Sequence, residues 1–117
     1  MFLEKAMDLG RLIGQAEEYK ALTRAQSAME SASELKLRFE RLEQLGAALE
    51  RAAEGGGEPP TEDAEEYDRV FGEVQADPRY QQLVAAQANF DKLMLRVQQR
   101  IAEGMKKAAE SSIITLS

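Results

Sequence analysis

The side chains that could do chemistry in this 117-residue chain are carboxylates, amines, guanidinium groups and hydroxyls, because the sequence contains neither histidine nor cysteine. Imidazole catalysis, thiolate or histidine metal sites and disulfides are therefore excluded. The serines have no histidine to activate them as nucleophiles. The run Gly55-Gly56-Gly57 lacks the lysine and the strand-to-helix context of a phosphate-binding loop. These residues do not indicate an enzyme.

Carboxylates crowd one short stretch of the chain. The group consists of Glu62, Asp63, Glu65, Glu66 and Asp68. A helical bundle could use such side chains to hold Mg²⁺ or Ca²⁺, but the spacing is not that of an EF-hand loop. We interpret the stretch as the solvated acidic face of a helix, and we expect no metal site and no cofactor.

Basic side chains gather farther along the chain. Lys92, Arg96, Arg100 and Lys107 fall within about an 80° sector of a helical wheel, opposite the apolar residues, and we call them the basic ridge. The ridge could bind RNA or an acidic protein. It could also be an ordinary polar face that the acidic helix of this or another subunit complements. The net charge of −6 disfavours RNA, whose binding depends on neutralising phosphates.

The composition is that of one helix-rich domain. Hydrophobic residues make up 44% and charged residues 31% of the chain, with only 8 glycines and 3 prolines. No apolar run approaches the roughly 20 residues that span a bilayer. The segment MFLEKAMDLG carries Glu4 and Asp8 where a signal peptide would be uncharged, so we expect no export and a cytoplasmic protein.

One long helix is predicted from Pro78 to Glu110. Asp77 suits its N-cap and Pro78 its first turn, and a helix of about 32 residues is about 48 Å long. Two sets of mostly apolar residues each share a face of this helix. The first is Leu83, Gln87, Phe90, Met94, Val97, Ile101 and Ala108, and the second is Tyr80, Val84, Leu95 and Ala102. Two sets predict a central helix with neighbours on two sides.

Four further helices are predicted, over about 1–13, 15–30, 34–54 and 61–75. Gly14 is expected to separate the first two, and Ser33 and Thr61 are expected to act as N-caps. A Gly/Pro loop, 55–60, joins the two halves of one domain that covers 1–117. The fold expected is an all-α bundle of about five helices built on the long C-terminal helix, with the third and fourth helices packed along it.

The apolar surplus on so small a chain predicts self-association. We expect a homodimer or a higher even-numbered oligomer whose contacts lie on the long helix. The candidate interface residues are Phe90, Met94, Leu95, Val97 and Ile101. The tail, 111–117, holds Ile113, Ile114 and Leu116 after the expected helix end near Glu110. It either packs loosely onto its own bundle or docks extended in a groove of a partner.

The order of these segments resembles the YlbF/YmcA family of small bacterial helical regulators. The resemblance is carried by Glu17-Glu18-Tyr19-Lys20, Gly57-Glu58-Pro59-Pro60, Gln75-Ala-Asp-Pro-Arg-Tyr80 and the run from Ala86 to Met94, AQANFDKLM. It covers the chain up to about Lys107.

The resemblance implies an all-α, cytoplasmic, oligomeric protein without catalytic residues. Members of the family act in complexes that influence competence, sporulation, biofilm formation and RNA maturation. Some carry iron–sulfur clusters on cysteines, which this chain lacks. We therefore expect a cytoplasmic regulator or adaptor that works through helical protein–protein contacts. The alternative is an RNA-binding or RNA-processing accessory factor that uses the basic ridge.

Overall fold

The computed structural model describes the backbone of residues 1–58 and 60–116 and the side chains of 1–58 and 60–111. Its elements are α-helices joined by short connections, which confirms the all-α prediction. They are α1 (Phe2–Gln15), α2 (Glu17–Glu30), α3 (Ser33–Glu54), α4 (Thr61–Ala76) and α5 (Pro78–Leu116).

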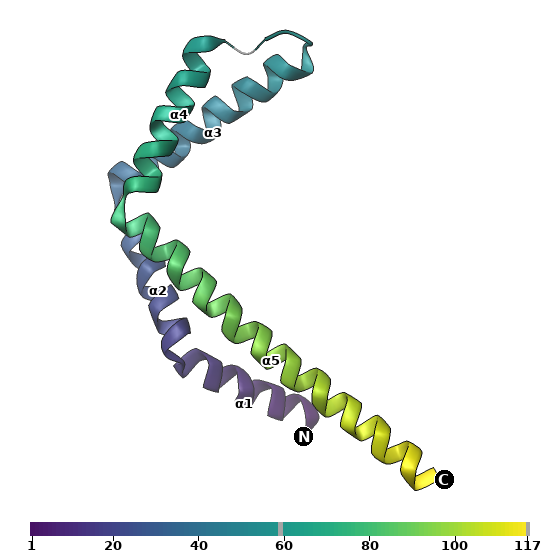
Figure 1. Cartoon of the computed structure of the whole chain (residues 1–117). Helices are drawn as coiled ribbons and strands as arrows, with labels where there is room; N and C mark the ends of the chain where they lie inside the picture. Colours follow the sequence, from purple (N-terminus) through teal and green to yellow (C-terminus); the bar gives the residue numbers. More distant parts are fainter. Residues whose placement is uncertain (59, 117) are drawn as a thin grey trace.

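The helices form an open V (Figure 1). One arm is the α3–α4 hairpin, and the other is α5 with α2 and α1 lying along it. The radius of gyration is 22.4 Å, whereas a compact domain of this length has about 13 Å. The longest dimension is 70 Å. The chain therefore has two arms joined at an elbow, where α2 passes into α3 and α4 into α5.

The partner of the long helix differs from the one predicted. The expectation that the third and fourth helices pack along it is wrong, because α2 lies along α5 and α3 pairs with α4. Only the end of α4 that adjoins α5 contacts it. The physical reason lies in the turn at Asp77, whose extended backbone swings α4 away from the α5 axis.

The elbow is held by a cluster of buried side chains from both pairs of helices. Leu35 is 0% exposed and packs with Ala32 and Val74, which are also buried. Phe39 of α3 and Tyr80 of α5 close the cluster, with ring centroids 6.0 Å apart. Tilted aromatic pairs at this separation are favourable. This cluster fixes where the two arms meet.

Two ion pairs tie α3 to α4 beyond the elbow. The guanidinium of Arg41 donates to both carboxylate oxygens of Glu66, at 2.7 and 2.8 Å. Nε of Arg38 lies 3.3 Å from a carboxylate oxygen of Glu73, and both side chains are partly exposed. Leu45 of α3 and Val70 of α4 are buried in the same arm. Exposed pairs of this kind add little stability, so the apolar contacts dominate.

A second cluster holds α2 against α5. Leu22, Ala25 and Ala86 are buried, and Leu83 and Phe90 pack against them. The Phe90 ring lies 5.7 Å from that of Tyr19. The alanines let the helix backbones approach closely at this point. The cluster covers one face of α5 over its first half only.

Asp77 caps α5 as predicted. Its carboxylate accepts a hydrogen bond from the backbone N–H of Arg79 at 2.9 Å, and the Arg79 guanidinium donates to both of its oxygens, at 3.1 and 2.8 Å. These bonds favour the ionised form. They lower the pKa of Asp77 from an ordinary 3.8 to about 2.

This pKa shift predicts a loss of stability in acid. Because the folded-state pKa lies below the unfolded one, ionised Asp77 stabilises the fold above about pH 4, and the contribution disappears as the pH falls through about 2. Asp77→Asn keeps a capping oxygen but cannot ionise. We expect the melting-temperature difference between wild type and this variant to be constant above about pH 4 and to shrink toward pH 2. A difference that stays constant over the whole range would contradict the assignment.

Three local boundaries differ from the prediction. Gly14 lies inside α1, and the break falls at Ala16, whose backbone is extended. Glu17 and Glu18 then occupy the first turn of α2, where the helix dipole favours acids. Ser33 and Thr61 are the first residues of α3 and α4 rather than N-caps, and the capping positions are Ala32 and Pro60. Among the loop residues described, Gly56 has φ +76°, the left-handed conformation that suits glycine.

The long helix also ends later than predicted, at Leu116 rather than near Glu110. The β-branched residues after Ser111 disfavour a helix by only a few tenths of a kcal/mol each, and the strong helix formers before them carry it on. The prediction of an extended tail is therefore wrong for the backbone up to Leu116. The side chains of Ile113, Ile114 and Leu116 lie outside the described residues, and so does the docking suggested for them.

Candidate protein interface

A large share of the apolar surface in this chain has no cover. α1 contributes no buried side chain, although it carries Phe2, Leu3, Met7 and Leu12, all well exposed. The accessible surface of the chain is 9109 Å². A compact monomer of 13.0 kDa exposes about 6,300 Å². The excess of about 2,800 Å² follows from the open V, which leaves these apolar side chains of α1 available for contacts outside the chain.

An open groove runs between α1 and the second half of α5. Leu9 of α1 forms one wall, and Val97 and Ile101 of α5 form the other. Arg96 and Arg100 line the same groove. A groove lined by apolar side chains and by two guanidinium groups suits an amphipathic segment that carries acidic side chains beside its apolar face.

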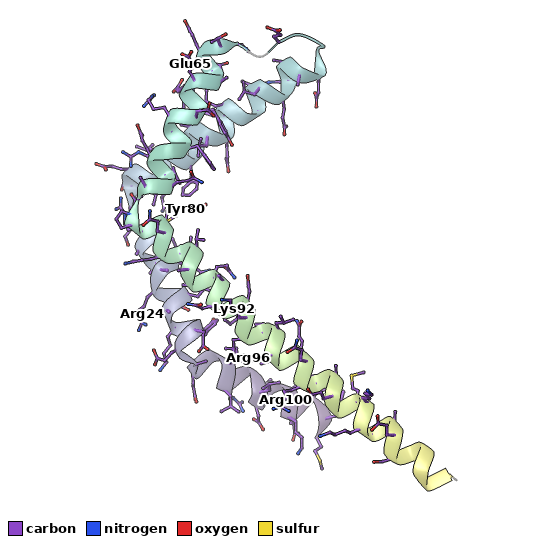
Figure 2. The ribbon with its side chains drawn as sticks, viewed as in Figure 1. Arg24, Glu65, Tyr80, Lys92, Arg96 and Arg100 are labelled. Atoms are coloured by element: carbon purple, nitrogen blue, oxygen red, sulfur yellow. The ribbon has the colours of Figure 1, made fainter. Side chains whose placement is uncertain are left out.

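The basic ridge follows this groove. Figure 2 shows Lys92, Arg96 and Arg100 on successive turns of α5, on the stretch that lies beside α2 and α1. Arg100 donates to Glu103 at 3.0 Å on its own helix. Among the described residues, no carboxylate pairs with Lys92, Arg96 or Lys107. Three of the four ridge cations, Lys92, Arg96 and Lys107, therefore have no carboxylate partner among the described residues and can meet an acidic partner.

Two acids of α2 also lie beside the ridge. Glu17 and Glu18 line a second depression together with Lys92 and Arg96, without forming an ion pair with them. These carboxylates reduce the positive potential on that flank of the ridge. A polyanion that approached from this side would meet both signs of charge.

The acidic face of α4 does not complement the ridge within the chain. Glu65 lies on the other arm, far from Arg96 (Figure 2). Glu66 and Glu73 are used by arginines of α3 and α4, and the hydrogen bond from Arg41 lowers the pKa of Glu66. Within the part of the chain that the structure describes, no three acidic side chains converge where they could hold a metal ion.

The five predicted interface residues fall into two groups. Phe90 packs against the α2 cluster, and Met94 and Val97 are half-buried. Leu95 and Ile101 are exposed. Phe90 therefore packs inside the chain, whereas Leu95 and Ile101 are available for contacts with other molecules.

Sequence reasoning missed the role of Leu9 and of α1 as a groove wall. The signal that could have found it is the distribution of apolar residues in α1, which lie on more than one side of the helix. Phe2 and Leu9 share one face of a helical wheel, and Leu3, Met7 and Leu12 lie on other sides of it. A helix with apolar residues on several sides needs packing partners on several sides, and within the chain α1 lies beside the rest of the fold on one side only.

A comparison with models of known protein families found a match that covers most of the chain. The model of a protein family described as control of competence regulator ComK, YlbF/YmcA, matches residues 2–106. This range includes α1, the groove and most of α5. A search of curated proteins and a search of solved structures each found no match. Over the described residues, no helix is both long and apolar enough to cross a membrane.

Proposed function

Because the chain belongs to the YlbF/YmcA family, whose description is control of the competence regulator ComK, we propose that it is a non-catalytic regulator that acts by binding another protein through its helices. It works in the cytoplasm without a cofactor, since no cysteine is present to hold an iron–sulfur cluster. The observation that carries the proposal is the open groove between α1 and α5.

The chemistry of the groove defines the partner. Leu9, Val97 and Ile101 offer apolar contact, and Arg96 and Arg100 offer charge-assisted hydrogen bonds at the edge. The partner segment is an amphipathic helix with an apolar face and acidic side chains along one side. Binding such a segment would cover α1, which the chain itself leaves exposed.

The groove can be tested by charge reversal. Arg96→Glu combined with Arg100→Glu should weaken binding of the protein partner at least about 10-fold, because each change replaces attraction by repulsion at a contact. The partner is first identified by pull-down from the native host with mass spectrometry, and its purified form is then titrated by calorimetry. Arg51→Glu, an exposed arginine on the other arm, serves as the matched control and should bind like wild type.

RNA binding is the second outcome that this experiment can reveal. The wild-type protein is titrated with single- and double-stranded RNA at low salt. Binding that falls steeply with salt and disappears in the Arg96/Arg100 variant would assign the ridge to RNA. The acidic side chains beside Lys92 and the net charge of −6 favour the protein partner. Equal binding of the protein partner by wild type and variant would contradict the proposal.

A further inference from the structure

The two arms of the V differ in charge. Residues 33–76, which include the α3–α4 hairpin, hold 12 acids and 5 bases, whereas the rest of the chain holds 9 acids and 10 bases. The hairpin therefore has a net charge of −7 and the remainder a net charge of +1. Three of the five hairpin bases are already paired with Glu66 and Glu73. The hairpin surface thus carries a large excess of negative charge.

An aromatic pair lies partly exposed on this hairpin. Tyr67 and Phe71 of α4 stack, with ring centroids 6.1 Å apart and ring planes inclined by 11°. The Tyr67 ring lies over Gly46 of α3, where a Cβ atom would be in ordinary van der Waals contact with it, at 3.8 Å. Phe71 is 40% exposed. The pair therefore lies along the junction of α3 and α4 and presents aromatic surface to other molecules.

Carboxylates flank the aromatic pair on both helices. On α3, Glu43 and Glu50 lie three residues before and four residues after Gly46, so they share its side of the helix. On α4, Asp68 lies three residues before Phe71. All three acids are exposed, and none forms an ion pair in the part of the chain that the structure describes. The aromatic–acidic surface is our name for Glu43, Glu50, Tyr67, Asp68 and Phe71.

Unpaired carboxylates beside an exposed ring suit a guanidinium group. An arginine can stack its planar head on a ring or donate two parallel hydrogen bonds to a carboxylate, whereas a lysine offers one compact and strongly hydrated charge. A nucleic acid or an acidic protein segment would be repelled by the net charge of the hairpin. The charge and the aromatic ring together therefore favour a basic segment that contains arginine.

We propose that the aromatic–acidic surface binds an arginine-containing basic segment of a partner protein, with one guanidinium group on Phe71 and others paired with Glu43 and Glu50. The proposal does not depend on the partner suggested for the α1–α5 groove. That groove lies on the other arm and suits an acidic segment. The two arms would thus select partners of opposite charge, and one chain could hold both.

Fluorescence anisotropy with defined peptides tests the surface on the full chain. The probes are three labelled peptides of equal length that carry arginine, lysine or glutamine at the same positions between leucines. The arginine peptide should bind most tightly, and its binding should weaken as salt is added. Glu43→Lys combined with Glu50→Lys should weaken this binding at least about 10-fold, because attraction becomes repulsion at the contact.

The matched control is Glu62→Lys combined with Glu65→Lys. It changes the net charge by the same amount at two exposed acids on other faces of α4, so it should weaken binding of the arginine peptide by less than about 3-fold. Equal losses in the control and in the Glu43/Glu50 variant would show that net charge alone attracts the peptide, and would overturn the site.

Phe71→Leu tests the ring itself, because leucine keeps an apolar side chain and has no π face. It should weaken binding of the arginine peptide about 3- to 10-fold, with a circular dichroism spectrum like that of wild type. Equal affinity for the arginine and lysine peptides, unchanged by Phe71→Leu, would overturn the stacking.

Sedimentation without peptide tests the other possible occupant, the basic ridge of a second copy of the chain. Wild type and the Glu43/Glu50 variant should sediment with the same mass at micromolar concentration. A mass that falls in this variant, and not in the Glu62/Glu65 control, would assign the aromatic–acidic surface to a second copy and overturn the proposed partner.

Discussion

Replacing Leu35 by alanine should lower the free energy of unfolding by about 2–5 kcal/mol, the largest effect expected of any single truncation in this chain. Leu35 is fully buried at the elbow, where it packs against Val74 and near Tyr80. Removing it leaves a cavity that two arms joined at this point cannot readily close. Since the chain has few buried side chains, no other cluster can compensate.

The measurement is urea denaturation followed by circular dichroism. Leu37→Ala, two residues farther along α3 and 64% exposed, provides a matched control that should change stability by less than about 0.5 kcal/mol. Equal destabilisation by the two substitutions would show that Leu35 does not have the packing described for it.

A second large effect is expected on the other arm. Phe90→Ala should lower the free energy of unfolding by about 2–3 kcal/mol. This is somewhat less than for a fully buried phenylalanine, because the ring is half-buried against Leu22 and Tyr19. The substitution loosens α2 from α5 and should increase amide hydrogen exchange in α2 more than in the α3–α4 hairpin.

Phe2→Ala is the control for Phe90→Ala, since Phe2 is 85% exposed and should contribute little to the stability of the single chain. If the Phe90 variant melted like wild type, the α2–α5 cluster would not be what holds these helices together. If exchange rose equally in both arms, the arms would unfold as one unit.

The helices themselves could be predicted from sequence because their signals are local. Asp77 and Pro78 mark the start of α5, and the glycine run marks the end of α3. The periodic apolar residues between these signals predict all five helices. The family followed from the order of the same segments. Errors at Gly14 and Ser33 were of one or two residues, where competing signals differ by less than about 1 kcal/mol.

The pairing of helices could not be predicted in the same way. The apolar sets on α5 show that it needs neighbours, but they do not say which helix lies on which set. The choice depends on the backbone of Ala16 and Asp77, where single residues in extended conformation set the directions of α2 and α4. The candidate interface could be predicted only in part for the same reason. The basic ridge was visible in the sequence, whereas the groove needs Leu9 and Val97 to be brought together in space.

The elbow also determines the order in which the chain can fold. Leu22 and Ala86 are about 60 residues apart, so joining α2 to α5 directly would require closure of a long loop. The α3–α4 hairpin has a short connection, and its partners are closer in sequence, with Arg41 and Glu66 25 residues apart, so its contacts form sooner. Once it forms, Ala32 and Val74 meet, and α2 and α5 leave from adjacent points. The hairpin thereby converts a distant pairing into a local one, and side chains at its base are expected to show high φ-values.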